Sequence, residues 1–552
     1  MKNRFLSLLC VLALCLGLLP VTALAVAPIG QVLYVGGVQI SSTGYWTTDS
    51  DGNVTASTAG ETPTDNYISY DAENNVLTLH NATIKKGLEY SENIEGGTYI
   101  FGSAIGVLNQ NGAAELTITL EGTNTIAEVG KGIFVLASST STGGATLTIT
   151  GGGSLNASAS QTGIWVQSNS KNAALCVENA EVTASSGVAF KNGVLVQAKD
   201  GSDVSLTVNG GSLTASVNAN IWFQFGSGAS GSGTPTVTVS NNAIVRANGG
   251  IANNSSTSIQ YGTGNKENGG IVWNGTGGTV YGNVTLQENL EIGEGESLTI
   301  GDGASLNTGS HEVIVNGGTL TGEVNGQQSP QITTPPQSQI VTEGESATFT
   351  IEASGSEPLS YQWQESTDSG SNWKSIAGAT STSYEIATTS TDMSDHQYRC
   401  VVTASGVSVV SDAATLTVNA PTTYTISADV DPAGAGTVKV NGSGTSATVE
   451  ANSDVTLTAT ANEGYRFTGW TSSDGGTFTD ASSESTTFTM PAGNVTVTAQ
   501  FAKVVTGVKL DKETLALYTG DSATLTATVE PSDAANQNVT WQSDNANVAT
   551  VE

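Results

Sequence analysis

The sequence repeats itself with a period of about 30 residues, and this repeat limits the possible folds more than any other feature. Five related segments, each an alternating apolar and polar strand followed by a Gly or Asn turn, begin at residues 116, 147, 175, 206 and 237. Short strands at such a period are typical of a solenoid in which each unit buries its apolar face on its neighbours. Three strands per unit and the absence of helical periodicity predict an all-β fold, a right-handed parallel β-helix.

The third strand of each unit carries the most unusual side chains. These strands are predicted to begin at Gly132-Ile133, Gly163-Ile164, Gly187-Val188 and Asn220-Ile221. Because side chains alternate between the two faces of a strand, the residue after each core aliphatic points outward. In chain order the outward positions are Gly106, Phe134, Trp165, Ala189, Trp222 and Ala252.

The aromatic members of this row predict a carbohydrate-binding surface. If the strands stack in register, Phe134 and Trp165 lie about 4.8 Å apart on one face, with Trp222 two units further on. Pyranose rings stack on such surfaces, and Gln167 and Gln224 are placed to hydrogen-bond sugar hydroxyls. The alternative is that a loop covers the rings, and residues 226–233 are long enough to do so.

The N-terminus has the pattern of a secretory signal peptide. Lys2 and Arg4 precede an apolar run over residues 5–19, and Ala23-Leu24-Ala25 forms a small-residue cleavage site. We therefore expect residues 1–25 to be a signal peptide and the protein to be secreted. No other apolar stretch approaches the roughly 20 residues needed to cross a bilayer, so membrane insertion is not expected.

Charge and cysteine content narrow the function further. The formal net charge is −32, which argues against nucleic acid as a partner because phosphate binding needs a basic surface. Beyond the signal peptide only Cys176 and Cys400 remain, in different predicted domains. A disulfide framework is therefore not expected.

The repeats belong to a predicted domain at residues 26–325. Hairpin-like segments at residues 31–84 are expected to cap the N-terminal end of the β-helix. A Pro-rich linker follows at 326–337. Residues 338–420 resemble an immunoglobulin-like domain, with Trp363 as the core tryptophan and Tyr398 as the tyrosine corner. Ile351 stands where such domains have their first cysteine, so Cys400 is expected to be a free, buried thiol.

Two further modules are identified from their motifs. EGYRFTGW at 463–470 and TFTMPAGNVTVTAQF at 487–501 are similar to a divergent InlB B-type repeat, assigned to residues 421–502. Residues 503–552 resemble an incomplete bacterial Ig-like group 2 domain. The resemblance implies a bacterial surface protein, with cell-wall attachment through a following segment as one expectation.

Catalytic groups are sparse in the repeats. The outward positions of the first strands carry one carboxylate, Glu178, whereas glycosidic bond cleavage generally needs two; this favours a protein that is not an enzyme. No cofactor is expected. Calcium is the alternative, with Asp49, Asp51 and Asn53 as ligand candidates, although Asp51-Gly52 also suits a hairpin turn. A second acidic group, Glu288, Glu291, Glu294 and Glu296, is interpreted as a solvated edge, with a weak calcium site as the alternative.

The segment YDAENNVLTLHNATI at residues 70–84 is followed by short repeats with glycine and asparagine turns. This pattern is similar to that of secreted carbohydrate-binding β-helices, one group of which binds polygalacturonate with calcium, and the resemblance covers residues 31–324. The leading hypothesis is an extracellular, non-catalytic protein whose head binds polysaccharide or a host surface for adhesion, carried on an Ig-like stalk. The alternatives are a polysaccharide lyase or glycosidase on the β-helix, and a purely structural or protein-binding adhesin.

Overall fold

The computed structural model describes residues 30–57, 62–94, 97–187, 192–216, 219–226, 231–264 and 268–552. The fold is nearly all β, with 57% of residues in strands and no α-helix in the described ranges. A single 3-10 turn, η1(Thr391–Met393), is the exception there. The predicted signal peptide lies outside the described residues. The chain divides into two compact units, one holding residues 1–339, 348–386 and 395–416, the other holding 340–347, 387–394 and 417–552.

The first unit begins with antiparallel strands. Hydrogen-bonded pairs form between β1 and β2, β1 and β9, β3 and β4, β3 and β5, β5 and β6, and β8 and β9. The strands are β1(Gln31–Val35), β2(Val38–Ile40), β3(Gly44–Thr48), β4(Val54–Ala56), β5(Tyr67–Asp71), β6(Val76–His80), β7(Thr83–Ile84), β8(Leu88–Ile94) and β9(Gly97–Asn109).

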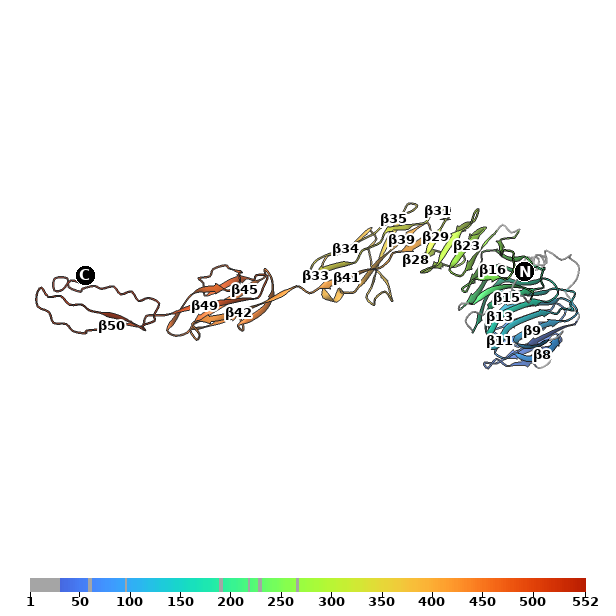
Figure 1. Ribbon diagram of the computed structural model, residues 1–552, viewed down its shortest axis with the longest axis horizontal. Helices are drawn as coiled ribbons and strands as arrows, with labels where there is room; N and C mark the ends of the chain where they lie inside the picture. Colours follow the sequence, from blue (N-terminus) through green and yellow to red (C-terminus); the bar gives the residue numbers. More distant parts are fainter. Residues whose placement is uncertain are drawn as a thin grey trace. The chain divides into compact units, whose positions relative to one another are not determined.

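Three parallel ladders follow, each built from strands about 30 residues apart (Figure 1). The first ladder contains β6, β10(Ala114–Glu121), β12(Ala145–Thr150), the first halves of β14(Ala173–Ser186) and β16(Val204–Ser216), β18(Pro235–Ser240) and β21(Gln260–Gly262). The second contains β7, the first halves of β11(Thr123–Ala137) and β13(Ser154–Ser168), the second halves of β14 and β16, β19(Ala243–Ala247) and β22(Gly270–Asn274). The third contains β9, the ends of β11 and β13, β15(Asn192–Ala198), β17(Asn220–Phe225) and β20(Ile251–Asn253).

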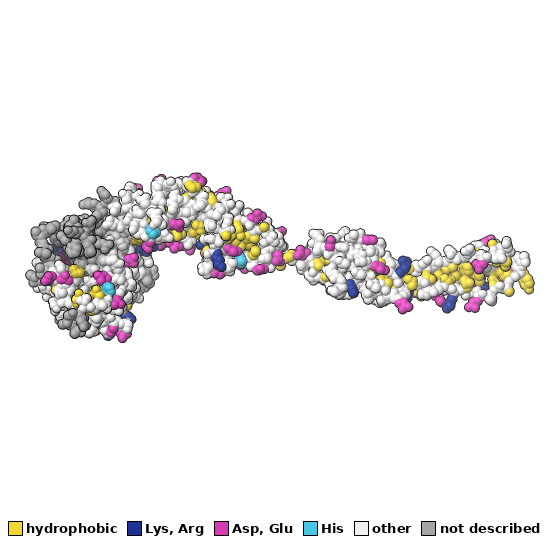
Figure 2. Space-filling view, turned by 180° about the vertical axis from the view of Figure 1, so that it is seen from behind, with side chains coloured by type: hydrophobic (Ala, Val, Ile, Leu, Met, Phe, Trp, Pro, Cys, Tyr) yellow, Lys and Arg dark blue, Asp and Glu magenta, His cyan; other side chains and the backbone are white. Residues whose placement is uncertain are grey.

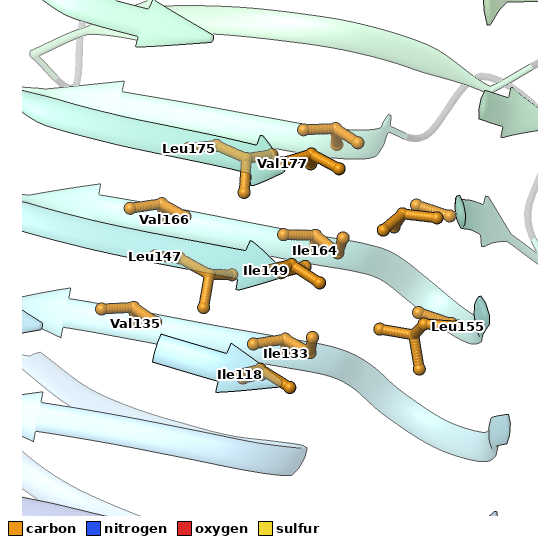
Figure 3. Close-up of a cluster of buried hydrophobic side chains, with 14 of the residues drawn as sticks. Ile118, Ile133, Val135, Leu147, Ile149, Leu155, Ile164, Val166, Leu175 and Val177 are labelled. Atoms are coloured by element: carbon orange, nitrogen blue, oxygen red, sulfur yellow. The ribbon is translucent and has the colours of Figure 1, made fainter. Parts of the chain in front are cut away.

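The core of the ladders is made mainly of aliphatic side chains that recur at the same register position in successive repeats, with Phe223 and Tyr261 at two of these positions. Figure 3 shows Leu147 and Ile149 of the first ladder with Ile164 and Val166 of the third, all fully buried. The same positions one repeat earlier and later carry Ile118, Ile133, Val135, Leu175 and Val177. Apolar burial at each step, at roughly 25 cal/mol per Å², is therefore the repeated stabilising interaction.

The predicted start of one third-ladder strand is wrong. The structure pairs Ile164 with Val194, so Gly193-Val194 occupies the register position expected for Gly187-Val188, and β15 begins at Asn192. Leu195, not Ala189, consequently stands beside Trp165; Ala189 itself is outside the described residues. The connection before this strand is longer than in the neighbouring repeats, and a loop can lengthen without disturbing the register.

The segment predicted to be a linker contains strands. β31(Gln327–Gln328) and β32(Gln331–Thr334) lie within residues 326–337, and β28(Val313–Asn316) pairs in parallel with β40(Val407–Val410) of the Ig-like module. One buried cluster accordingly includes both Val313 and Val407. The end of the repeat region and this part of the Ig-like module thus share a sheet and a core, a long-range pairing that the proline content of the segment did not indicate.

The remaining strands of this region are short. They are β23(Gly277–Tyr281), β24(Asn283–Thr285), β25(Leu290–Ile292), β26(Ser297–Ile300), β27(Ser305–Asn307), β29(Thr319–Thr321), β30(Glu323–Val324), β33(Gln339–Thr342), β34(Ala347–Thr350), β35(Glu352–Ser354), β36(Ser360–Ser366), β37(Lys374–Ser375), β38(Ser383–Ile386), β39(Gln397–Ala404) and β41(Ala414–Asn419).

The core side chains selected within residues 338–420 are buried as expected, with one difference in hydrogen bonding. Trp363 is fully buried, and Cys400 is confirmed as a free, buried thiol. Tyr398 is buried and stacks on Phe349, with ring centres 4.8 Å apart. Its hydroxyl donates to Oε1 of Glu365 at 2.8 Å, whereas a tyrosine corner bonds to the backbone.

The second unit contains two four-stranded sheets around one core that includes Trp470 and Phe488, and a C-terminal module with one strand pair. The strands are β42(Thr423–Asp431), β43(Gly436–Val440), β44(Ser446–Glu450), β45(Asp454–Ala461), β46(Tyr465–Ser472), β47(Thr477–Phe478), β48(Ser485–Thr489), β49(Val495–Lys503), β50(Gly507–Leu510) and β51(Ala527–Glu530). The C-terminal module exposes many apolar side chains (Figure 2), among them Leu517, Tyr518 and Val548.

Candidate functional site

The outward row of the third ladder brings the predicted aromatic residues together. Phe134 pairs with Trp165, Trp165 with Leu195, and Leu195 with Trp222. The row begins at Gly106 and ends at Ala252. Trp165 and Trp222 are thus two strands apart, as predicted, with an apolar leucine between them where an alanine had been expected.

The rings of Phe134 and Trp165 are in contact but do not form a flat platform. Their centres lie 5.0 Å apart and their planes are inclined by 53°. Phe134 is only 3% exposed and packs with Leu108 and Leu136, whereas Trp165 and Trp222 are partly buried. The stackable surface therefore lies on the two tryptophans. The segment considered as a cover, residues 226–233, is in part outside the described residues.

A lysine that the sequence analysis did not select lies against both rings. The ammonium Nζ of Lys131 is 4.7 Å from the ring centre of Phe134 and 4.8 Å from that of Trp165. Lys131 is 9% exposed, and burial lowers the pKa of its ammonium. Two cation–π contacts therefore hold a largely buried positive charge in this face of the ladder.

Three glutamines form a second row on the same ladder. Gln167 pairs with Gln197, and Gln197 with Gln224. The Nε2 atoms of Gln197 and Gln224 donate to the carbonyl oxygen of Gly226, at 3.3 and 3.4 Å. No donor in the described ranges reaches the Oε1 atoms of these two side chains, so they are available acceptors for hydroxyl groups.

Gln167 has a different environment from its two neighbours. It is 7% exposed, and its Nε2 donates to Oδ1 of Asn169 at 2.7 Å. Gln197 was not predicted as a site residue, because the strand was placed six residues too early. The Val-Gln dipeptides at 166–167 and 196–197 were the available signal.

The indole nitrogen of Trp165 has an unsatisfied hydrogen bond. Nε1 is buried, and the described residues supply no acceptor for its N–H. Together with Lys131, this face therefore presents two hydrogen-bond donors on adjacent strands, β11 and β13, beside one another. Buried donors without acceptors are uncommon in folded proteins.

The calcium candidates form a tight turn between β3 and β4. Both carboxylate oxygens of Asp49 accept hydrogen bonds from Asn53, at 2.9 Å from its backbone N and 2.7 Å from Nδ2. These bonds lower the pKa of Asp49. Oδ1 of Asn53 accepts from the ammonium of Lys86, which lies outside the turn. The carboxylate of Asp49 is thus engaged within the turn, as the hairpin alternative predicts, and the oxygen of Asn53 is engaged by Lys86.

Other acidic side chains are also engaged structurally. Glu296 accepts from Nη1 of Arg246 at 2.6 Å, and the Arg246 guanidinium lies 4.2 Å from the ring centre of Trp273. The outward positions chosen from the sequence have the predicted register and carry one carboxylate, Glu178. The same face of β10 also holds Glu115 and Glu121, which lie outside those positions. Over the ranges that the structure describes, no cluster of three or more His, Cys, Asp or Glu residues is placed to hold a metal ion.

Comparisons with known proteins identify the modules after the repeats. Family models match residues 331–420 as a domain of unknown function, residues 424–505 as a divergent InlB B-repeat domain, and residues 504–552 as a bacterial Ig-like domain of group 2. No curated protein matches the chain. Among the described residues, no helix has the length and apolar character of a membrane span.

Solved structures resemble only small parts of the chain. A chimeric titin Z1Z2 protein carrying an exogenous decorin peptide is 25% identical over 17% of this chain and 97% of its own, with a TM-score of 0.14. Titin M4 is 26% identical over 17% of this chain and 98% of its own, with a TM-score of 0.14. DIP-gamma IG1+IG2 is 17% identical over 18% of this chain and 51% of its own, also with a TM-score of 0.14. The InlB-type repeat and the bacterial Ig-like domain are typical of extracellular surface proteins, and together they are consistent with a modular bacterial surface protein.

Proposed function

We propose that this protein is a secreted or wall-attached, non-catalytic surface protein whose repeat region, residues 26–325, binds polysaccharide or a host-surface glycan. The modules after residue 325 act as a stalk that displays this head. Neither nucleic acid nor a membrane is a partner in this proposal, and binding needs no cofactor; calcium is the alternative to be tested.

The proposal assigns the repeat region to a right-handed parallel β-helix. Its support is the register of three ladders in which successive strands are parallel and about 30 residues apart. Connections of this length pass through the other two ladders before each returns to its own. A right-handed path is the rule for parallel crossovers.

The observation that carries the binding proposal is the side-by-side arrangement of the tryptophan row and the glutamine row. Trp165 and Trp222 present partly exposed rings on β13 and β17. Gln224 lies two residues after Trp222, and Gln197 lies two residues after Leu195 on β15, the strand between them. An apolar ring beside amide acceptors matches a pyranose, which has a C–H face and equatorial hydroxyls. The strand spacing of roughly 4.8 Å suits an extended polymer that runs across the strands.

A protein-binding or structural adhesin is the second candidate, and the burial of Phe134 favours it. A ring that is covered contributes packing instead of ligand contact. In that case the loops would make the contacts, and replacing the tryptophans would change stability without changing any glycan affinity.

A glycan array with the full chain, run with and without calcium, tests the proposal. Retention of at least one polysaccharide, and its loss in Trp165→Ala plus Trp222→Ala, would support a carbohydrate-binding head. Binding that survives the double change would point to the second candidate. Release of shortened or unsaturated products from a polyuronate would instead establish a lyase or glycosidase.

A further inference from the structure

We propose that Lys131 makes this surface selective for an acidic glycan, and that it pairs with a carboxylate on a sugar stacked at Trp165. This inference rests on the proposed glycan-binding function and names the class of polysaccharide. Lys131 is thus assigned as a specificity-determining residue, in contact with the ligand and separate from the neutral stacking surface at Trp222.

The first argument is the lack of a counterion. The ion pairs between described residues involve other lysines, such as Lys85 with Glu128 and Lys503 with Asp533, and none involves Lys131. This is unexpected in a chain with 49 acidic and 17 basic residues. A largely buried ammonium ordinarily pairs with a carboxylate, because charge is otherwise poorly solvated in the protein. At Lys131, the ring faces of Phe134 and Trp165 contact the ammonium where a carboxylate would ordinarily do so.

The second argument is the neighbouring indole. The N–H of Trp165 is buried and has no acceptor in the described part of the chain. Lys131 and Trp165 are both hydrogen-bond donors, so a ligand that satisfies them must supply acceptors. The positive charge of the ammonium selects a negative acceptor, since a charge-assisted bond is about twice as strong as a neutral one.

The third argument is the polarity of the whole row. At the end of the row near Phe134, the groups without a hydrogen-bond acceptor in the described ranges are two donors, Nζ of Lys131 and Nε1 of Trp165. At the end near Trp222, the groups without a donor there are two acceptors, the Oε1 atoms of Gln197 and Gln224. An acidic sugar provides both complements: a carboxylate for the donors and hydroxyls for the amide oxygens. A carboxylate also has two oxygens, one for each of the two donors.

This arrangement differs from recognition through calcium. In a cation-bridged complex, acidic side chains of the protein and the carboxylates of the polymer share a metal ion. Here the protein supplies the positive charge itself. Binding of a polyuronate by the full chain should therefore persist when calcium is chelated.

The test compares a charged polymer with its uncharged methyl ester. Affinities of the full chain for a polyuronate and for its methyl ester are measured with a calcium chelator and 150 mM salt. We expect the unmodified chain to prefer the free acid by about tenfold, the size of one charge-assisted bond. Equal affinity for the acid and the ester would overturn the proposal while leaving neutral glycan binding intact.

Variants identify the residue responsible. Lys131→Met, which keeps the apolar stem, should lose the preference for the acid and retain binding of the ester. Lys131→Arg should restore the preference. Lys199→Met, at an exposed lysine of the same unit, is the control for net charge and should behave as the unmodified chain. A preference unaltered in Lys131→Met would contradict the assignment.

Failure of the proposed function gives a different result. If Trp165→Ala plus Trp222→Ala leaves both the acid and the ester bound, the row is not the binding surface, and both proposals fail together. If the double change abolishes both while Lys131→Met keeps the preference, only the acidic-glycan inference fails. If Lys131→Met does not fold, the affinities of the unmodified chain and of Lys131→Arg for the acid and the ester still test the inference. Equal affinities for the two polymers would overturn it.

Discussion

The ammonium of Lys131 lies 4.8 Å from the ring centre of Trp165, on the adjacent strand of the third ladder. This contact changes what the aromatic row can do. A row of rings alone would be a neutral stacking surface, whereas a ring with a buried positive charge beside it discriminates between neutral and acidic ligands. The most informative changes are therefore those that separate packing, charge and ring stacking.

The close packing of neighbouring repeats leaves no room for a side chain at Gly132. A Cβ at Gly132 would lie 2.3 Å from the carbonyl oxygen of Gly163 in the next repeat, and backbone cannot easily move away. Gly132→Ala should lower the free energy of unfolding of the first unit by about 2 kcal/mol or more. Gly152→Ala is the matched control, because no atom lies within 4 Å of its added Cβ. Equal urea midpoints for the two variants would show that the ladders are looser than described.

The ion pair between Arg246 and Glu296 should contribute to stability because it is partly buried and shared with an aromatic ring. Arg246 also lies over Trp273, and Oε2 of Glu296 accepts from the backbone N of Gly293 at 3.0 Å. Arg246→Ala should cost about 1–3 kcal/mol in thermal or urea unfolding. Lys509→Ala removes a solvent-exposed pair with Glu530 and should have no measurable effect. Equal losses of stability in Arg246→Ala and Lys509→Ala would contradict the expectation that the partly buried ion pair contributes more than the exposed one.

Cys400 should be unreactive in the native chain. Burial raises the pKa of its thiol from 9.0 to about 11, so the thiolate fraction at pH 8 falls by about two orders of magnitude. Alkylation of Cys400, followed by peptide mass spectrometry, should be at least about 100-fold slower in buffer than in urea. Rapid native alkylation would mean that this part of the Ig-like core opens readily.

The same pKa shift predicts a pH dependence of stability. Because the folded pKa is raised, the folded state holds this proton more tightly, and its contribution to stability is complete below about pH 9. It is lost progressively as the pH rises toward about 11. Cys400→Ala should be less stable at pH 8 but should show a smaller decline in stability between pH 9 and 11. A parallel decline in both proteins would exclude Cys400 as its cause.

The period of the repeat could be predicted because the same core positions are filled by buried apolar side chains in successive repeats. Leu116, Leu147 and Leu175 are spaced by the length of one repeat, and the structure pairs them directly. The register failed at Gly187 because the loop before a strand can change length without changing the core, and a Gly-Val dipeptide happened to precede the real Gly193-Val194. Spacing fixes the order of strands but does not fix the length of each connection.

The role of Lys131 could not be predicted from the sequence. A lysine in an alternating strand ordinarily points to solvent, and the pairing of β11 with β13 shifts register twice just before Lys131, between Ile126 and Val129 and between Val129 and Lys131. Such bulges redirect side chains. Similarly, the pairing of β28 with β40 joins residues more than 90 positions apart, for which neither strand carries a local signal.

Trp165→Ala plus Trp222→Ala, measured against a polysaccharide that the unmodified full chain retains, tests the central claim most directly. Loss of two stacking rings at about 1 kcal/mol each predicts an affinity about 30-fold lower. Trp541→Ala, at a 40% exposed tryptophan of the C-terminal module, is the control and should leave the affinity unchanged. An affinity of the double variant within about threefold of the unmodified chain, with the fold intact by circular dichroism, would contradict the account.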